Sequence, residues 1–249
     1  MKIAACKLSI VPLRAEAAHR SEMVSQVLFA EVFEILEETT DFSRVRLLDT
    51  GYEGWIQKGT FDILTSSFGT KFIVDIKGAV AADKELRVNL LHGTPVSIEG
   101  LDIGKQSYVV QGAIRLPSLQ DFDVELPKLV AYYSNSPYLW GGRSSQGIDC
   151  SGFSQVVYRH FGIPLKRDAW QQAEQGTVVD FLTEIKAGDL AFFDNEDGRI
   201  THVGIMLDRD TIVHASAFVR IDKMDNQGIF NADLKRYTHK LRIVKRYFE

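Results

Sequence analysis

The feature that most constrains the fold is a change of sequence pattern near residue 120. Before it, short alternating runs such as "SRVRLLD" (43–49) are separated by closely spaced turns, one of them marked by Gly51 and Gly54. This pattern predicts short strands that form a small barrel. After it, helical patterns come first and strands follow, which predicts an α+β unit rather than a doubly wound sheet.

We expect three regions along the chain. Residues 1–68 are predicted to form a small all-β barrel, and residues 69–120 an additional β region that could be a second, degenerate barrel and that ends in a linker. Residues 121–249 are predicted to hold helices over about 122–135, 150–161 and 167–176, then strands over 189–194, 201–208, 211–216, 218–222 and 241–248.

Charge and hydropathy argue against two classes of partner. The net charge of −4 and the isoelectric point near 5.9 do not favour a nucleic acid or an anionic membrane. No apolar run approaches the roughly 20 residues of a membrane span. The N-terminal "IAAC" resembles a lipoprotein cleavage box, but the apolar stretch is shorter than the roughly 7–15 residues that a signal peptide needs. We therefore interpret Cys6 as an interior strand position and expect a cytoplasmic protein.

Cys150 follows a glycine- and serine-rich loop and begins the second predicted helix. The chain has only two cysteines, far apart in the sequence, which does not indicate a disulfide framework. A thiol at a helix N-terminus, with Asp149 or Cys150 near the N-cap, feels the positive end of the helix dipole, which lowers its pKa. The same backbone N–H groups could stabilise an oxyanion. Cys150 is thus a candidate nucleophile, with a buried small side chain as the alternative.

Two of the six histidines are placed to serve such a nucleophile. His202 and His214 lie on strands joined by "DRD", a plausible hairpin turn, so that antiparallel pairing brings them opposite or diagonal to each other. The pattern permits a Cys–His–His arrangement. His160 and His239 lie in polar surroundings that we expect to be exposed, and His92 lies in the N-terminal part.

A zinc site is the alternative for these histidines. His202 and His214 could bind zinc together with Asp194. The sequence contains neither an HExxH nor a CxxC motif, however, and we expect no metal and no other cofactor.

Five blocks in the second half carry a family resemblance. They are "YLWGGRSSQGIDCSGFSQVVYRHFGIPLKRDAWQQAEQG", "GDLAFFD", "ITHVGIML", "IVHAS" and "VRID". Residues 124–249 therefore resemble the NlpC-type cell-wall cysteine peptidases, a compact branch of the papain-like superfamily. The order of "SEMVSQVLFAEVFEILEE" and "GYEGWI" resembles the bacterial SH3-like domains found beside cell-wall enzymes. The resemblance implies that Cys150 is the nucleophile, His202 the general base and acid, and His214 the residue that orients the base.

The resemblance also implies a substrate. The family cleaves γ-D-glutamyl–diamino acid bonds, and a subgroup with an SH3-like domain takes free muropeptides that have an unblocked N-terminal L-alanine. In that subgroup the amine lies near the nucleophile, where Asp149, Ser151 and Tyr138 match. We expect Asp149 to be a buried carboxylate that awaits the substrate ammonium, because a blocked amine would then leave its charge unpaired.

Further substrate contacts follow from the same resemblance. Tyr52 and Glu22 match positions that help to wall off the amine pocket. Arg167 and Asp168 match two residues of an "RDS" motif, but Ala169 replaces its serine, which casts doubt on one substrate contact.

Two other functions remain open from the sequence. The chain could be a binding module whose peptidase half is only a scaffold, or a peptidase or amidase that acts on intact cell wall. The presence of Cys150, His202 and His214 together favours the peptidase. The oligomeric state and the choice between diaminopimelate and lysine are not encoded in any motif that we recognise.

Overall fold

The structure, a computed structural model, describes residues 2–64 and 69–248. The chain divides into an N-terminal unit, Met1–Asp123 with Arg159–Pro164, and a C-terminal unit, Val124–Tyr158 with Leu165–Glu249. The predicted end of the first domain, residue 68, lies outside the described residues.

Within residues 2–64, the N-terminal unit forms an antiparallel sheet in the order β3-β2-β6-β5-β4-β1-β7. Its strands are β1 (Lys2–Cys6), β2 (Ile10–Arg14), β3 (Met23–Leu28), β4 (Val32–Glu38), β5 (Phe42–Leu47), β6 (Glu53–Gln57) and β7 (Phe61–Ile63). The alternation predicted for residues 43–49 is confirmed, since Val45 and Leu47 are buried while Arg44 and Arg46 are exposed.

Cys6 lies at the end of β1 and is fully buried in the core of this sheet. Its thiol donates a hydrogen bond to the carbonyl oxygen of Leu8 at 3.3 Å. The prediction of an interior strand position is therefore confirmed.

Residues 69–123 add a second antiparallel sheet to the N-terminal unit. Its strands are β8 (Phe72–Ala82), β9 (Arg87–Leu90), β10 (Pro95–Val96), β11 (Leu101–Ile103) and β12 (Gln106–Arg115), with β8 paired to β9, β10 and β12. A cluster that includes Val74, Ala81 and Tyr108 also contains Ala5 of β1 and Phe29 of the turn between β3 and β4. The two sheets of this unit thus share a hydrophobic core. That this region is a second SH3-like unit stays a prediction.

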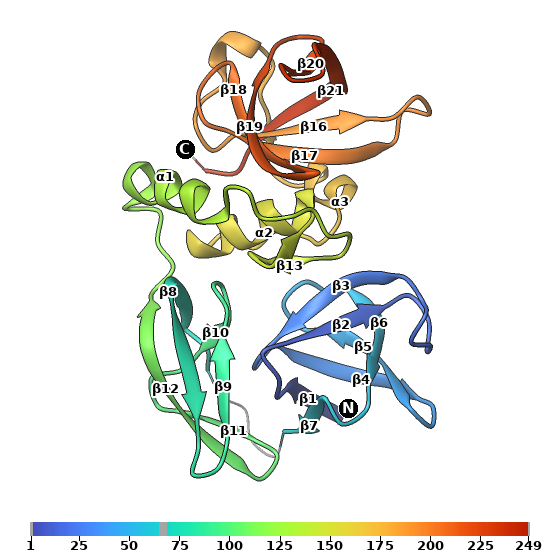
Figure 1. The fold of residues 1–249 in the computed structure, drawn as a ribbon, viewed down its shortest axis with the longest axis vertical. Coiled ribbons are helices and arrows are strands. Elements are labelled where there is room, and N and C mark those ends of the chain that lie inside the picture. Colours follow the sequence, from blue (N-terminus) through green and yellow to red (C-terminus); the bar gives the residue numbers. More distant parts are fainter. Residues whose placement is uncertain (1, 65–68, 249) are drawn as a thin grey trace. The chain divides into compact units, whose positions relative to one another are not determined.

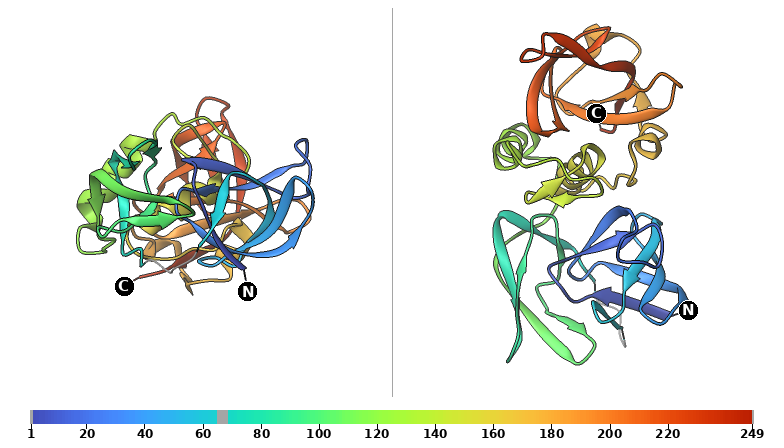
Figure 2. Two further views of the ribbon diagram at one scale, coloured as in Figure 1. Left: turned by 90° about the horizontal axis from the view of Figure 1, so that it is seen from below. Right: turned by 45° about the vertical axis from the view of Figure 1, so that its right-hand side comes forward.

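The C-terminal unit places its α-helices before its large sheet in the sequence. Its helices are α1 (Phe122–Tyr133), α2 (Cys150–His160) and α3 (Ala169–Ala173), with the short 3₁₀ helix η1 (Leu182–Glu184). Figures 1 and 2 show α1, α2 and α3 on one side of the C-terminal sheet. Phe153, Val156 and Val157 are fully buried, which confirms the inward face predicted for α2.

The C-terminal unit has a small two-stranded sheet and a larger sheet that closes into a circuit. The small sheet consists of β13 (Arg143–Ser144) and β14 (Gly147–Ile148). The larger sheet contains β15 (Thr177–Val178), which pairs only with β21, and the strands of the circuit, β16 (Leu190–Asp194), β17 (Ile200–Met206), β18 (Thr211–Ser216), β19 (Phe218–Met224), β20 (Gly228–Asn231) and β21 (Arg236–Arg246). Strands β16 to β20 pair in sequence order, and β21 pairs with both β16 and β20. The order of helices and strands is the predicted one, although sheet exceeds helix among the described residues.

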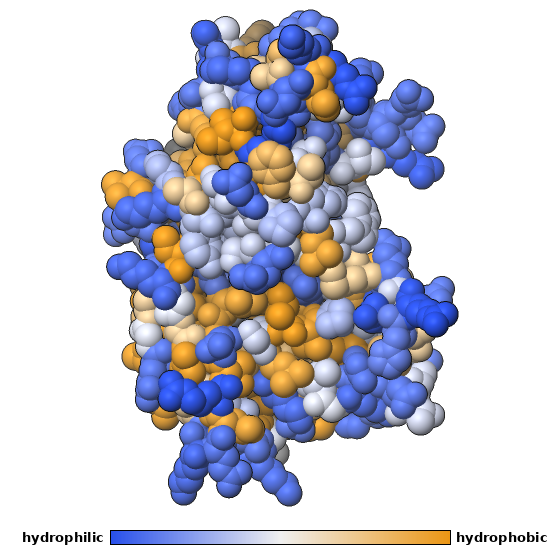
Figure 3. Space-filling view, viewed as in Figure 1, coloured by the Kyte–Doolittle hydropathy of each residue, from blue (hydrophilic) through white to orange (hydrophobic). Residues whose placement is uncertain are grey.

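Polar residues form the tip of the β16–β17 hairpin. Residues 195–199, "NEDGR", are exposed, and this projecting tip is hydrophilic in the space-filling view (Figure 3). Of the helices that the structure describes, none is long and apolar enough to cross a membrane.

Candidate active site

Asp149 directly precedes α2 and caps its N-terminus. Its carbonyl oxygen accepts the N–H of Phe153 at 2.9 Å, and its carboxylate accepts the N–H of Gly152 at 2.6 Å. Only glycine fits at position 152, because a Cβ there would overlap the carbonyl oxygen of Gly142. This cap leaves Cys150 in the first turn of the helix, where the residue is 5% exposed.

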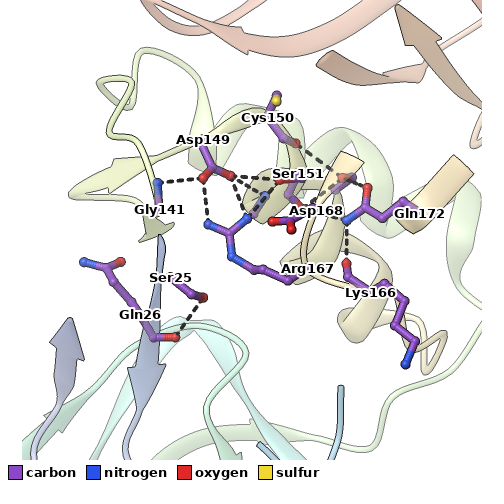
Figure 4. Close-up of polar contacts among 12 residues, drawn as sticks. Ser25, Gln26, Gly141, Asp149, Cys150, Ser151, Lys166, Arg167, Asp168 and Gln172 are labelled. Carbon is purple, nitrogen blue, oxygen red and sulfur yellow. Dashed lines mark hydrogen bonds and ion pairs between the residues drawn. The ribbon is translucent and has the colours of Figure 1, made fainter. Parts of the chain in front are cut away.

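Arg167 forms a bidentate ion pair with the same carboxylate (Figure 4). Its Nη2 lies 2.6 Å from Oδ2 of Asp149 and its Nη1 lies 3.1 Å from Oδ1, and both side chains are buried. The carboxylate also accepts the N–H of Gly141 at 2.8 Å and the hydroxyl of Ser151 at 3.3 Å. With the N–H of Gly152, five donor contacts surround Asp149.

The open carboxylate expected from the sequence is therefore absent from this part of the described structure. An ionised carboxylate offers about four lone-pair sites, which these contacts fill. Arg167 also compensates the negative charge of Asp149. The expectation that Asp149 awaits a cation was wrong, because Arg167, 18 residues further along the chain, already supplies one.

Gln172 of α3 holds in place the segment that contains Arg167. Its side-chain amide donates to the carbonyl oxygen of Ser151 at 3.0 Å and to that of Lys166 at 2.8 Å. Gln172 is fully buried. Two hydrogen bonds from one buried amide thus hold the residue before Arg167 against the first turn of α2 (Figure 4).

The thiol of Cys150 lies in a desolvated environment beside β17. It makes a hydrogen bond with the backbone of Val203, the residue after His202. Burial, and after it the charge of Asp149, raise the pKa of Cys150 to about 12. The prediction of a lowered pKa was wrong, because desolvation of the thiolate outweighs the helix N-terminus. The resting thiol is protonated at neutral pH.

His202 and His214 face each other across β17 and β18. The register pairs Gly204 with His214, so that His202 lies diagonal to His214. Nε2 of His202 lies 2.9 Å from Nδ1 of His214, and both residues are buried. The predicted diagonal placement is confirmed.

Asp222 of β19 sets the tautomers of this pair. Its Oδ2 lies 3.0 Å from Nε2 of His214. Burial raises the pKa of Asp222, but hydrogen bonds from His214 and Arg220 outweigh it and hold the pKa below its ordinary value. The ionised carboxylate only accepts, so His214 donates from Nε2 and accepts the Nε2–H of His202 at Nδ1. The Nδ1 of His202 is left as the basic nitrogen.

His239 of β21 stacks on His202. The ring centroids are 4.0 Å apart with an interplanar angle of 26°, and Oγ1 of Thr238 lies 2.9 Å from Nδ1 of His239. Burial, then His239 and His214, lower the pKa of His202 well below its ordinary value, and burial lowers that of His239 to about 4. Both rings are neutral at pH 7. The prediction that His160 and His239 are exposed was wrong, because His160 is fully buried and His239 is half-buried against the ring of His202.

The other predicted substrate residues of the C-terminal unit lie in two places. Burial, then Cys150 and Asp149, raise the pKa of Tyr138, which places its phenol near both groups. Asp168 instead caps α3 in a capping box with Gln171. Tyr138 thus joins the candidate site, while the position of Asp168 is explained by the helix that it caps.

Tyr52 and Glu22 belong to the N-terminal unit. Tyr52 packs against the core of the first sheet, and Glu22 is exposed. Their role in walling off an amine pocket stays a prediction.

Among residues 2–64 and 69–248, one group of side chains could hold a metal ion: His202, His214 and His239, each with one ring nitrogen within 4.8 Å of the others. Asp194, which the zinc alternative included, is not part of this group. We call these three residues the histidine cluster.

Sequence reasoning missed Asp222 and His239. Asp222 stands in "FVRID", on the strand that follows His214, and the alternation of that strand puts it on the same face as the directly opposed pair His214–Arg220. This signal could have identified Asp222. His239 lies on a strand that pairs with neither β17 nor β18, so no local pattern pointed to it.

The chain matches two family models. One, described as the NlpC/P60 family, matches residues 135–238, and the other, described as the bacterial dipeptidyl-peptidase Sh3 domain, matches residues 13–59.

Curated relatives extend the match over most of the chain. A γ-D-glutamyl-L-lysine dipeptidyl-peptidase of Bacillus subtilis (strain 168) is 30% identical over 213 residues, which cover 77% of this chain and 71% of the relative. Dipeptidyl-peptidase 6 of Lysinibacillus sphaericus is 26% identical over 263 residues, covering 89% and 92%. An NlpC/P60 family protein from Bacillus cereus ATCC 10987 has a similar fold, with a TM-score of 0.76 at 16% identity over 98% of this chain and 99% of that one.

Alkylation of Cys150 by iodoacetamide should accelerate steadily with pH. Since only the thiolate reacts and the thiol pKa is about 12, the rate should rise about tenfold per pH unit between pH 7 and 10. Peptide mapping by mass spectrometry separates Cys150 from Cys6, and a Cys150→Ala variant identifies the Cys6 signal. A rate that reaches a plateau below pH 7 would show that the pKa is lowered after all.

Replacing Arg167 by alanine should lower the free energy of unfolding by about 3–5 kcal/mol, because a buried carboxylate loses its ion-pair partner. Urea denaturation followed by tryptophan fluorescence measures the loss. Lys128→Ala, which breaks an exposed ion pair with Glu125, is the matched control and should cost about 1 kcal/mol or less. Equal losses in both variants would contradict the importance of the buried pair.

Replacing Asp222 by asparagine should reduce kcat roughly 10²–10⁴-fold, because the base loses the negative charge that stabilises its protonated form. KM should change little, since Asp222 is buried behind His214. Steady-state kinetics separate the two constants. Asp222→Glu, which keeps the charge, should recover part of kcat, and a loss confined to KM would argue against this role.

Proposed function

We infer the function of this chain from the family to which it belongs, the NlpC/P60 cell-wall peptidases, here with a bacterial SH3 domain in the N-terminal half. We propose that it hydrolyses the γ-D-glutamyl–diamino acid bond of short peptides derived from peptidoglycan. The observation that carries this proposal is the hydrogen-bonded series His202–His214–Asp222 on the sheet that contacts the Cys150 thiol.

The chemistry begins from a neutral pair. Nδ1 of His202 takes the proton of Cys150 as the sulfur attacks the γ-D-glutamyl carbonyl carbon. Because both pKa shifts oppose a resting thiolate–imidazolium pair, proton transfer and attack occur together rather than in sequence. The imidazolium that forms donates from Nε2 to His214, whose own donor contacts the ionised Asp222.

The protonated His202 then acts as the general acid for the leaving group. His202 delivers its proton to the amine of the departing diamino acid as the C–N bond breaks. Water, deprotonated by the same nitrogen, hydrolyses the acyl-enzyme and restores the thiol. Backbone N–H groups in the first turn of α2 stabilise the oxyanion in both halves of the reaction.

The substrate class comes from the relatives. Both curated relatives described above are named as dipeptidyl-peptidases, and the one from Bacillus subtilis is named for the γ-D-glutamyl-L-lysine bond. A dipeptidyl-peptidase cleaves after the second residue from a free N-terminus and releases a dipeptide. We therefore propose a substrate that begins L-Ala–γ-D-Glu and continues with a diamino acid.

The free amine has to bind beside an Asp149 carboxylate that already accepts five hydrogen-bond contacts. The contact from the Ser151 hydroxyl, at 3.3 Å, is the longest of the five to this carboxylate. We propose that the substrate ammonium takes its place, with the phenol of Tyr138 as a second acceptor. Arg167 then stays paired with Asp149. The ammonium hydrogen-bonds to a carboxylate whose negative charge Arg167 already compensates.

Soluble peptides are the favoured substrates over intact wall. An amine pocket accepts only peptides with a free N-terminus, whereas the peptides of intact wall are attached to glycan through that end. The cytoplasmic location and the role in muropeptide recycling are part of this proposal. A non-catalytic binding protein and a hydrolase of intact wall are the outcomes that the experiment must separate from it.

The test is cleavage of synthetic L-Ala–γ-D-Glu–L-Lys with a free and with an acetylated N-terminus, followed by chromatography. The free peptide should be cut, and acetylation should reduce kcat/KM roughly 10²-fold or more, because the acetyl group removes the ammonium and the hydrogen bonds that it donates to Asp149 and Tyr138. The diaminopimelate peptide, assayed in parallel, determines the preferred diamino acid.

Cys150→Ala is the control for a contaminating peptidase and should have no activity. Cys6→Ala, which removes the other buried thiol, should retain activity. If the acetylated peptide is cut equally well, the amine pocket is wrong and intact wall is the better substrate. If no peptide is cut but one binds, the binding-module alternative replaces the peptidase.

A further inference from the structure

The histidine cluster brings together ring nitrogens from three strands. His202 comes from β17, His214 from β18 and His239 from β21, and one nitrogen of each lies within 4.8 Å of the others. The peptidase reaction proposed above uses His202 and His214. It gives no role to the nitrogens of His239.

Two of the three rings have an outer hydrogen-bond partner that turns the other nitrogen inward. Asp222 accepts from Nε2 of His214 at 3.0 Å, which directs Nδ1 toward the cluster. Oγ1 of Thr238 lies 2.9 Å from Nδ1 of His239, which leaves Nε2 for a ligand. A carboxylate or hydroxyl on the far nitrogen is the arrangement that orients histidines around metal ions in proteins.

We propose that the histidine cluster binds a zinc-type divalent cation and that this binding switches the peptidase off. Three imidazoles suit zinc, whose usual ligands are nitrogen and sulfur. The inhibitory part of the proposal rests on the peptidase function, whereas the binding part does not.

The His202–His214 pair needs only a small adjustment to accept the ion, whereas the ring of His239, stacked on His202 at an interplanar angle of 26°, has to tilt so that its Nε2 points at the same position. Nε2 of His202 and Nδ1 of His214 are 2.9 Å apart. In a tetrahedral zinc site with N–Zn bonds of about 2.0–2.1 Å, two ligand nitrogens lie about 3.4 Å apart. Rotation of the two side chains by a few tenths of an ångström at their tips therefore opens the pair. Three protein ligands leave a fourth position, which water can take.

Metal binding would prevent His202 from acting as a base, because it changes the tautomer of the ring. In the metal-free pair, His202 carries its hydrogen on Nε2 and has its lone pair on Nδ1. A cation on Nε2 requires the other tautomer, so the hydrogen moves to Nδ1 and the ring neither gains nor loses a proton. The nitrogen that should accept the thiol proton is then already protonated. Peptide hydrolysis stops without any change in the fold.

The test is a titration of the metal-free chain with Zn²⁺ by isothermal calorimetry, in the absence of peptide. Co²⁺ serves as a second probe, since its visible absorption reports tetrahedral ligation and distinguishes nitrogen from sulfur ligands. The variant is His239→Phe, which keeps an aromatic ring beside His202 but removes a ligand. His19→Phe, at an exposed histidine of the N-terminal unit, is the matched control.

We expect one Zn²⁺ per chain, with the affinity reduced at least about tenfold by His239→Phe and unchanged by His19→Phe. Cys150→Ala should still bind, because three imidazoles remain. Zn²⁺ should also inhibit peptide cleavage, and EDTA should reverse the inhibition. Thermal denaturation of each variant confirms that it is folded.

Three results would overturn the proposal. They are no binding at micromolar Zn²⁺, equal binding by the chain and its His239→Phe variant, or binding that Cys150→Ala abolishes while His239→Phe does not. The last result would assign the metal to the thiol. If Zn²⁺ binds as expected but no peptide is cut by the metal-free chain, the peptidase function fails and the metal site stands.

Discussion

The candidate site depends on one buried ion pair, between Asp149 and Arg167. Its carboxylate also caps α2 and receives an N–H from the glycine loop, so that a single side chain fixes the loop, the helix and the segment before α3. Desolvating two charges is unfavourable, and only the full set of donors compensates for it. These contacts fix the position of the next residue, Cys150, which has little freedom to move.

Neutrality of the resting groups is the second consequence of burial. The thiol and the two stacked imidazoles are all desolvated, and each therefore favours its uncharged form. The negative charge of Asp222 lies at the far end of the histidine pair, where it stabilises the cation only once that cation exists. Such an arrangement favours charge separation in the transition state over charge separation in the free enzyme.

The sequence predicted those parts of the site that local patterns determine. The helix after the glycine loop, the buried face of α2 and the diagonal placement of His202 and His214 follow from periodicity and one hairpin turn. The partner of Asp149, the exposure of His239 and the pKa of Cys150 could not be predicted, because each depends on side chains brought together from distant segments. Burial decided the thiol pKa, and no sequence pattern measures burial at a helix end.

The closed circuit of strands in the C-terminal unit has a consequence for synthesis. Because β21 pairs with both β16 and β20, the circuit cannot close until β21 has left the ribosome, which delivers the chain from its N-terminus. Cys150, His202 and His214 are by then already made, but His239 arrives only with that strand. A nascent chain thus carries its reactive residues without their final surroundings, and the complete site forms in a single late step.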